Sequence, residues 1–540
     1  MLDLQFWFGN KEGETRRLYG VKLTAGLPTV KESTQVDRLF KLKNRLGTFT
    51  TSQLNSAQRR MNVFAELSRR YPGVINRCVW KFLHLNHMLK NALVRPTTTN
   101  RTQLVRETEP LLFVDLCGGP GGFAWAMLRK VGWRCLGYGI TLNSTEDYML
   151  YNKIQYHPQF TVHADDEYRN DILELEVMFK FVKSVGQDRA HVIMADGAFD
   201  MGAIDENHKE CATFKLILHE VWLILRLLRP EGVAIVKIFD TFNRCTRDLI
   251  YILSCAFRDV GLLKPCTSKN TNSEKYLVLR YRHKNIAHII NYVWECIVLL
   301  NNAKADVCHF ERLLDGEQDE KFLTFIDTAT NHFLRSQMDG VTEMLAYLED
   351  PYKRNTLHTV ANDYADEWCV NTLLAVPTIV IPVEFKSEIK RLDIKDIASS
   401  VQRRVVRVSV PANVFWVMVT SDGELVKCAD ERTVIGRVVL PRRSILLVDV
   451  AQLPRLEVID VYRLGDEIVG EAGPYVNYRY QNLLVFCKMF AHTCARKQVL
   501  KLKNVKEPGT YYAFNGSFKR AQMTFTDAGF CDMDKLPADK

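Results

Sequence analysis

A short segment that begins at residue 111 joins an apolar run, a cluster of glycines and a second apolar run: LLFVDL, CGGPGG and FAWAMLRKV. The first run has the length and composition of a buried strand, and the last has the apolar spacing of a helix. Where a strand turns through glycines into a helix, the backbone can approach a ligand closely, and the helix N-terminus offers amide donors. The segment therefore predicts an α/β fold with a nucleotide-like ligand at the turn.

The alternation of strands and helices continues beyond this segment. Four more strand-like runs follow, WRCLGYGITL, HVIMAD, GVAIVKIF and KYLVLRYR, and helical spacing is found over 123–131 and 212–230. Such alternation is typical of a mostly parallel, doubly wound sheet. We therefore expect one Rossmann-like α/β domain over 61–284, whose first part, 61–94, forms two helices separated at a YPG sequence.

The remaining parts of the 540-residue chain differ from this domain in their sequence patterns. At roughly 150 residues per domain, this length predicts two to four domains. We interpret residues 1–60 as an irregular, basic N-terminal extension and 285–369 as a helical connector. Alternating β-rich runs predict a second, mainly antiparallel domain over 370–500, and 501–540 form a weakly specified tail.

The composition places the protein among ordinary soluble globular chains, with 47% hydrophobic and 25% charged residues. A net charge of +9 and a pI of about 8.8 are compatible with an anionic partner such as RNA, without proving one. Basic residues gather early in the chain, where they form either a solvated surface or an RNA-contacting arm: Arg38, Lys41, Lys43, Arg45, Arg59 and Arg60.

Neither a membrane segment nor a metal site is predicted. The first residues lack a basic leader followed by an apolar core, and no apolar run reaches the roughly 18 residues of a membrane helix. We therefore expect a soluble, intracellular protein that does not associate with a membrane. No CxxC pair occurs, and the nearest group of metal-ligand types, Cys487, His492 and Cys494, lies in an apolar stretch that is typical of buried reduced thiols.

The glycine turn by itself leaves the cofactor open. Gly119, Gly121 and Ala124 satisfy the loose dinucleotide pattern GxGxxA. Asp115, however, ends the strand where it would repel a pyrophosphate, and Pro120 interrupts the turn. A cationic cofactor without phosphates, such as S-adenosylmethionine, therefore suits the turn better than NAD. A tight turn without any ligand is the remaining alternative.

Three later strands carry ionisable residues at or near their ends. Asp196 follows HVIMA, Lys237 lies inside GVAIVKIF, and Glu274 precedes KYLVL. In a doubly wound sheet, the carboxyl ends of neighbouring strands converge on one crevice. Lysine is rarely buried without a partner, so Lys237 is the most telling of the three, although a snorkelling lysine is the alternative.

These motifs together resemble a known family. DLCGGPGGF, IMADG, VAIVKIFD and KPCTSKNTNSEKYLV, in this order and spacing, are similar to the FtsJ-like S-adenosylmethionine-dependent RNA ribose 2'-O-methyltransferases, and among them to the eukaryotic cap-specific enzymes. The resemblance covers 61–284. It implies a catalytic Lys-Asp-Lys-Glu tetrad, whose members here would be Lys81 in VINRCVWKFLHLN, Asp196, Lys237 and Glu274.

The resemblance also implies a cofactor site and an RNA site. Asp171, within Asn170-Asp171-Ile172, is similar to an acidic residue that the family places near the adenosine, although a solvated acidic loop is an alternative. The cofactor S-adenosyl-L-methionine would be bound by Asp115, Cys117, Gly118, Gly119, Pro120, Gly121, Gly122, Phe123, Asp171 and Asp196. The RNA would be contacted by Lys264, Ser268 and Lys269, unless these lysines are simply surface residues.

The sequence departs from the family pattern at two positions outside the tetrad. Gly118 stands where the family has alanine, a change that we expect a glycine turn to tolerate. Lys269 follows Ser268 where the family has serine-arginine, which keeps a charge for RNA phosphate but loses the bidentate fork of arginine.

The second domain resembles the guanylyltransferase-like domain that follows the methyltransferase in cellular cap enzymes. The resemblance rests on SILLVDVAQ and LEVIDVYRLGDEIVGEAGPYVNYRYQNL. An active guanylyltransferase needs a Lys-x-Asp-Gly motif, whereas this chain has Thr420-Ser421-Asp422-Gly423. We therefore expect an inactive domain that binds RNA or a partner, or that only stabilises the chain. A localisation segment, a glycine patch and a WW module are not recognised, which favours a viral or minimal relative.

The resemblance implies methyl transfer to the 2'-hydroxyl of the first transcribed nucleotide of capped mRNA, which converts cap-0 to cap-1. Lys237 would be the general base, a role that requires its neutral form. The implied partners are the capped mRNA 5' end and other capping or transcription machinery, in the nucleus rather than the cytoplasm. The alternatives are an rRNA or tRNA 2'-O-methyltransferase, a catalytically weak RNA-binding capping scaffold, and a dehydrogenase.

Overall fold

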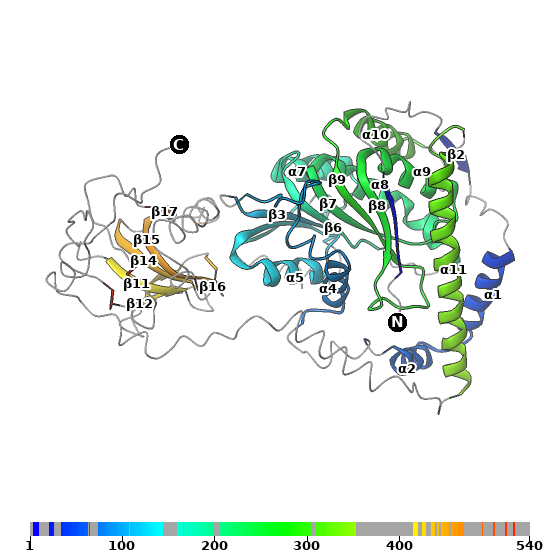
Figure 1. Ribbon diagram of the computed structural model, residues 1–540, viewed down its shortest axis with the longest axis horizontal. Helices are drawn as coiled ribbons and strands as arrows, with labels where there is room; N and C mark the ends of the chain where they lie inside the picture. Colours follow the sequence, from blue (N-terminus) through cyan, green and yellow to red (C-terminus); the bar gives the residue numbers. More distant parts are fainter. Residues whose placement is uncertain are drawn as a thin grey trace.

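The strands predicted over 111–282 lie in one eight-stranded sheet in the computed structural model, in the order β1-β8-β9-β7-β6-β3-β4-β5 (Figure 1). The eight strands are β1 Leu4–Gly9, β3 Leu111–Leu116, β4 Cys135–Ile140, β5 Phe160–Val162, β6 Ala190–Ala195, β7 Leu228–Ile238, β8 Phe257–Lys264 and β9 Lys275–Arg282, of which β1, β5 and β8 were not predicted. The structure describes residues 4–9, 21–25, 34–62, 64, 74–106, 109–143, 159–165, 167–198, 206–303, 308–316, 318–350 and 352. Beyond residue 413 it describes mainly the residues of the β-strands.

The sheet is parallel from β7 to its edge strand β5 and antiparallel on the other side. Parallel pairs join β5 to β4, β4 to β3, β3 to β6 and β6 to β7, whereas β9, β8 and β1 are added antiparallel. All residues of β3 and β6 are buried, which explains their continuous apolar sequences. The sheet confirms the predicted Rossmann-like α/β class, and it brings the carboxyl ends of β3, β6 and β7 to one edge.

Helices cover both faces of the sheet (Figure 1). One face packs against α4 (Cys78–Met88) and α5 (Gly122–Val131). The other packs against α7 (Leu175–Val185), α8 (Lys209–Leu227), α9 (Arg244–Ala256) and α10 (Ala287–Asn301). The predicted helix over 123–131 is confirmed. The helix predicted over 212–230 ends earlier, because Leu228 already pairs with Ala190 as the first residue of β7.

The interpretation of residues 1–60 as irregular is wrong. β1 pairs antiparallel with β8, from Leu4 opposite Lys264 to Gly9 opposite Asp259. Two helices follow, α1 (Thr34–Leu46) and α2 (Thr51–Met61). The partner of β1 lies some 250 residues further along the chain, so no local pattern indicates that this segment extends the sheet. The first of the two helices expected over 61–94 lies outside the described residues.

The segment after β9 is helical as expected, apart from one strand. α10 is followed by β10 (Cys308–Arg312), which pairs with β2 (Lys22–Ala25), and then by the long helix α11 (Glu320–Glu349). α10 and the first turns of α11 contribute to the hydrophobic core of the sheet. α11 contacts β1, α1 and α2, and α1 lies alongside it in Figure 1.

Part of the basic cluster on α1 and α2 has a structural role. Arg45 forms an ion pair with Glu349 at 2.7 Å, and Arg60 donates to the carbonyl oxygen of Tyr347. Both interactions attach the first two helices to α11. The cluster is therefore in part an attachment and not a freely solvated arm.

A second sheet is formed beyond residue 413. Its strands are antiparallel in the order β13-β12-β11-β14-β15-β16, and β17 pairs parallel with β15. Their bounds are β11 Val414–Val419, β12 Glu424–Lys427, β13 Val434–Arg437, β14 Ile445–Gln452, β15 Arg455–Leu464, β16 Glu467–Ile468 and β17 Leu500–Leu502, and a short pair joins β18 Phe514–Asn515 to β19 Gln522–Met523. Residues 420–423 and the thiols and imidazole at 487, 492 and 494 lie outside the described residues. Within the described ranges, no helix is both long and apolar enough to cross a bilayer.

Candidate active site

A cavity of about 1340 Å³ opens where the carboxyl ends of β3, β4, β6 and β7 meet the first turn of α4. Its walls include all four members of the predicted tetrad, Lys81, Asp196, Lys237 and Glu274. Lys81 comes from α4 and Lys237 from β7. Asp196 directly follows β6, and Glu274 directly precedes β9. The structure therefore brings together four side chains that are up to 193 positions apart in the sequence.

Asp196 and Lys237 form the first ion pair of the cavity. Lys237 Nζ lies 3.0 Å from Asp196 Oδ1, and it also donates to the carbonyl oxygen of Asp196 at 2.5 Å. The register explains the proximity, because Val236 of β7 lies opposite Ala195 of β6. Both side chains are about nine-tenths buried. This burial, together with the two contacts to Asp196, fixes the position of the Lys237 ammonium group.

Lys81 and Glu274 form the second pair. Lys81 Nζ lies 2.8 Å from Glu274 Oε1 and 3.0 Å from Oε2, and both side chains are at most one-tenth exposed. Burial by itself would raise the pKa of Glu274, but the charges of Lys81 and Lys237 hold it well below its usual value. Burial would lower the pKa of Lys81, but Glu274 and Asp196 raise it. Both partners are therefore charged at neutral pH.

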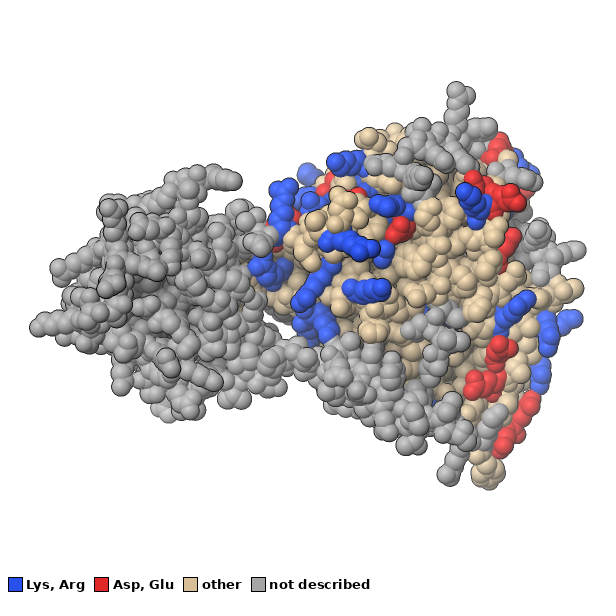
Figure 2. Space-filling view, in the orientation of Figure 1, with Lys and Arg blue, Asp and Glu red and all other residues tan. Residues whose placement is uncertain are grey.

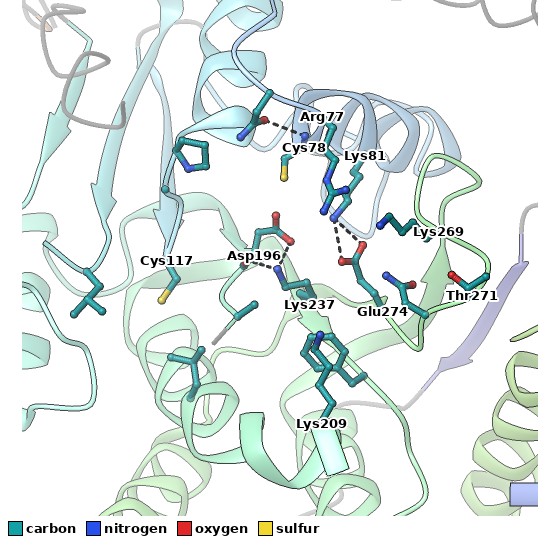
Figure 3. Close-up of a pocket in the computed structure, with 18 of the residues that line it drawn as sticks. Arg77, Cys78, Lys81, Cys117, Asp196, Lys209, Lys237, Lys269, Thr271 and Glu274 are labelled. Atoms are coloured by element: carbon teal, nitrogen blue, oxygen red, sulfur yellow. Dashed lines mark hydrogen bonds and ion pairs between the residues drawn. The ribbon is translucent and has the colours of Figure 1, made fainter. Parts of the chain in front are cut away.

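The two pairs face each other across the cavity (Figure 3). Tyr276 supports the first pair, because its hydroxyl donates to Asp196 Oδ1 at 2.9 Å. Tyr276 lies opposite Lys237 in the β7–β9 register. Tyr276 was not among the predicted site residues, although the alternation of side chains along a strand places it on the same side as Glu274.

The glycine turn is packed more tightly than its sequence suggests. A Cβ on Gly118 would lie 2.1 Å from Asp115 Oδ2, and one on Gly122 would lie 2.2 Å from Asn76 Oδ1. Side chains are thus excluded by neighbouring groups of the protein itself. An alanine at 118, the residue of the family pattern, would require the carboxylate of Asp115 to turn, so glycine is the residue that fits this turn.

Several residues that were predicted to bind the cofactor lie behind the cavity wall. Asp115 is fully buried beneath Gly118 and is not among the lining residues. Phe123 is a core residue, with its ring 5.7 Å from that of Phe82. Gly118, Gly121 and Gly122 are also outside the lining. These five residues therefore do not line the cavity, because the tight turn directs them into the protein.

The part of the turn that does reach the cavity consists of Cys117, Gly119 and Pro120. The amide of Gly119 donates to Thr141 Oγ1 at 3.1 Å, which joins the turn to the end of β4. Asp171 also lines the cavity. Its Oδ1 accepts from the amide of Leu173 at 2.9 Å, so the carboxylate is held in place by its own loop.

Only one of the three predicted RNA contacts faces the cavity. Lys269 lines it, whereas Lys264 is buried and donates to the carbonyl oxygens of Asn272 and Glu274 at 2.8 and 2.7 Å. Ser268 is buried too, and its hydroxyl donates to Glu274 Oε1 at 2.7 Å. Lys264 and Ser268 therefore do not line the cavity, because β8 ends with its lysine pointing into the loop that carries Glu274.

Two thiols of the cavity wall are unsuited to nucleophilic chemistry. Burial and the charge of Asp196 raise the pKa of Cys78 to about 12. Burial and Glu220 raise the pKa of Cys117 well above its usual value. A thiol is a nucleophile only as thiolate, so neither group supplies one at neutral pH.

Comparisons with known proteins agree with this geometry. Residues 74–282 match the model of the FtsJ-like methyltransferase family. This part of the chain is an FtsJ-like methyltransferase domain. The matched range contains all four members of the predicted tetrad, together with α4, α5 and the strands from β3 to β9.

Curated relatives of the domain carry one name. Cap-specific mRNA (nucleoside-2'-O-)-methyltransferase 1 of Drosophila melanogaster is 27% identical over 327 residues, which cover 58% of this chain and 40% of that protein. The Homo sapiens protein of the same name is 28% identical over 293 residues, 51% of this chain and 34% of its own length. A solved structure named as a ribosomal RNA methyltransferase of Plasmodium falciparum matches 38% of this chain and 97% of its own, at 14% identity and a TM-score of 0.25. The chain thus spans about two fifths or less of the length of these curated relatives.

The FtsJ-like domain is not the sole contributor to the cavity. Lys43 and Asn44 from the end of α1, and Gly47 and Thr48 from the turn into α2, line it as well. They precede the matched range. From the sequence, this segment was either a solvated surface or an RNA-contacting arm. Its place in the wall was not predictable, because only the attachment of α1 and α2 to α11 brings it over the carboxyl edge of the sheet.

A buried carboxyl group lies directly beneath the Asp196 turn. Glu220 of α8 is fully buried, and a Cβ on Gly197 would lie 2.3 Å from Glu220 Oε1. Burial raises the pKa of Glu220 to about 8, and the charge of Lys237 partly opposes this shift. Glu220 is thus predominantly protonated in the folded domain at neutral pH, in contact with the turn that presents Asp196.

This raised pKa predicts a pH-dependent stability. Between the ordinary carboxyl pKa of about 4.3 and the folded value, the unfolded chain loses a proton that the folded chain retains, so stability falls as pH rises through this window. Replacing Glu220 by glutamine should remove the dependence. We expect the midpoint of thermal unfolding of Glu220→Gln, measured relative to the parent, to rise by several degrees between pH 5 and pH 8. Glu295→Gln, at an exposed position of α10, is the control and should show no such trend.

Proposed function

We propose that this chain transfers a methyl group from S-adenosylmethionine to the ribose 2'-hydroxyl of the first transcribed nucleotide of capped mRNA, converting cap-0 to cap-1. Lys237 acts as the general base within the Lys81-Asp196-Lys237-Glu274 tetrad. The proposal rests on the FtsJ-like domain, on the names of its curated relatives and on the distribution of charge around the cavity.

That distribution of charge is the observation that carries the proposal. Among the described residues, the part of the wall formed after β3 and β4 and by the Asp171 loop contains no Lys or Arg, and it consists of Cys117, Gly119, Pro120, Thr141, Leu142, Asn170, Asp171 and Ile172. Another part carries five basic side chains, Lys43, Arg77, Lys81, Lys209 and Lys269. A cofactor without phosphates fits the first part and a polyanion fits the second. Asp196 and Lys237 lie between them.

The residues of the cation-free part fit S-adenosylmethionine. The carboxylate of Asp171 can accept from ribose hydroxyls, and Leu142 and Ile172 offer apolar surface to an adenine ring. When bound, this cofactor supplies a methyl group on a positively charged sulfur that a ribose oxygen can attack. NAD fits less well, because its pyrophosphate would find no cationic side chain on this part of the wall.

The chain's own residues position and activate the hydroxyl. Asp196 holds Lys237 through two contacts, which leaves one direction of Nζ for the ribose 2'-hydroxyl, whose proton Lys237 accepts in its neutral form. The Lys81 ammonium, fixed by Glu274, lies where it can hydrogen-bond the ribose or the adjoining phosphate. Positioning and proton removal are the two contributions that this site makes.

A methylation assay with matched RNAs tests the proposal. Two RNAs of identical sequence, one with a 7-methylguanosine cap and one with a 5'-triphosphate, are incubated with labelled S-adenosylmethionine, and the methylated position is determined by nuclease digestion and mass spectrometry. We expect the capped RNA to be methylated at the first 2'-oxygen at least tenfold faster. Equal rates would contradict cap specificity and favour an rRNA or tRNA substrate. Cofactor binding without any methyl transfer would favour an RNA-binding scaffold.

A further inference from the structure

A basic surface lies at the edge of the FtsJ-like domain that is remote from the cavity. It is formed by Lys90 and Arg95 after α4, Arg101 in the following hairpin and Arg129 at the end of α5, and we call it the α4–α5 basic surface. All four side chains are exposed. Figure 2 shows Lys and Arg gathered over this part of the domain. Both helices end here before the chain enters β3 and β4, so the surface lies at the amino ends of these parallel strands.

The sequence around this surface lacks compensating charges. The chain contains 63 acidic residues in 540, yet neither 74–106 nor 116–145 contains one. Some exposed basic residues elsewhere in the described ranges do have acidic partners, as in Arg45 with Glu349 and Lys22 with Glu311. In the same ranges, no acidic side chain forms an ion pair with any of the four residues of the α4–α5 basic surface. Their positive potential is therefore available to an external anion.

The local structure holds these charges together. Residues 97–103 form a small hairpin in which Thr97 pairs with Gln103 and the amide of Thr99 donates to Glu231 Oε2 at 2.6 Å. Leu93 and Leu128 belong to the same hydrophobic cluster, so the loop after α4 is packed against α5. Arg129 lies over the ring of Trp125 at 5.1 Å, which orients its guanidinium group. The surface is thus an ordered array on packed elements.

Helix α4 connects the cavity to this surface. Lys81 lines the cavity near the start of the helix, and Lys90 follows its end. At ~1.5 Å per residue, α4 rises ~10 Å from Lys81 to Met88. This distance corresponds to about three stacked nucleotides at ~3.4 Å each. An RNA strand that leaves the cavity along α4 therefore reaches the basic surface within a few nucleotides.

We propose that the α4–α5 basic surface binds the phosphate backbone of the transcript downstream of the modified nucleotide. The partner is single-stranded RNA, recognised by charge and without base specificity. This inference rests on the proposed function only in taking RNA as the substrate. It assigns the increase of RNA affinity with RNA length to a region separate from the residues that carry out methyl transfer.

The test compares two lengths of RNA and two variants of the full chain. The first variant replaces Lys90, Arg95, Arg101 and Arg129 by glutamine. The matched control replaces four exposed basic residues on other elements, Arg258, Lys284, Lys321 and Arg335, and has the same net charge. Dissociation constants for a capped trinucleotide and a capped 30-nucleotide RNA are measured over a series of salt concentrations, together with methylation rates on the trinucleotide.

We expect the parent and the control to bind the longer RNA at least tenfold more tightly, and the first variant to lose most of this advantage. For the longer RNA, the slope of the logarithm of this variant's binding constant against the logarithm of salt concentration should become shallower by roughly 2 to 3. Each phosphate contact on a single strand contributes ~0.7 to this slope. Trinucleotide binding and methylation should stay within about twofold of the parent. An unchanged length advantage, or an equal loss in the control, would overturn the inference, and an acidic protein would then be the better partner. If neither the parent nor a variant methylates the trinucleotide, the proposed function fails while the binding comparison still decides this inference.

Discussion

Lys237→Met should lower kcat for 2'-O-methyl transfer by about 10²- to 10⁴-fold, the range that positioned general bases contribute. Methionine keeps the length of the chain but cannot accept the hydroxyl proton. Affinity for S-adenosylmethionine and for capped RNA should change less than about threefold, because the cavity walls stay in place. Single-turnover methylation and separate binding titrations measure the two effects.

Lys237→Arg separates proton removal from electrostatic stabilisation. Arginine retains the positive charge beside Asp196 but is not deprotonated in proteins, so it cannot act as a base. We expect this variant to be as inactive as Lys237→Met, whereas Lys284→Met, at an exposed position, should behave as the parent. Substantial activity of Lys237→Arg would contradict the assignment of Lys237 as base and would favour a purely electrostatic role.

Glu274→Ala should destabilise the domain by roughly 3–5 kcal/mol and abolish methyl transfer, because the Lys81 ammonium would lose its partner in a buried site. Lys81 is 6% exposed and its Nζ contacts both carboxylate oxygens of Glu274. The stabilisation should be retained across the neutral range. It should be lost as pH falls below about 4, since pairing lowers the pKa of Glu274 below its unfolded value.

A double substitution distinguishes the structural and catalytic roles of the pair. Lys81→Met with Glu274→Leu removes both charges and keeps approximate volume, and replacing a buried ion pair by apolar residues is often neutral for stability. We expect its unfolding midpoint to return to near that of the parent, while methyl transfer stays absent. A double variant as unstable as Glu274→Ala would show that the single substitution acts through lost packing and not through an uncompensated charge.

Local sequence signals identified the central sheet well. β3, β4, β6 and β9 are short apolar runs bounded by polar or glycine residues, and their prediction depends only on residues near in sequence. β1 was missed because its partner β8 is distant along the chain. The exact start of β7 was missed because α8 runs into it without a loop.

The candidate site also contains residues that could be predicted from the sequence and residues that could not. Asp196, Lys237 and Glu274 were predictable, because strand ends in a doubly wound sheet meet at one edge, and the family resemblance added Lys81. Asp115, Lys264 and Ser268 were also predicted for the site but lie outside the cavity lining, because side-chain direction depends on what is packed behind each residue. Lys264 points into the loop of Glu274 and Asp115 lies beneath Gly118.

The sequence by itself determined the α/β class, the edge of the sheet at which the site lies and the types of residue that form it, since these follow from apolar periodicity and strand order. Only the tertiary structure decided which of those residues reach the cavity, that α1 contributes to its wall, and that the described basic side chains of the wall come from elements other than the ends of β3 and β4. The physical reason is that burial and charge pairing depend on neighbours distant in sequence. The orientation of a side chain toward a ligand or toward the core is therefore not encoded locally.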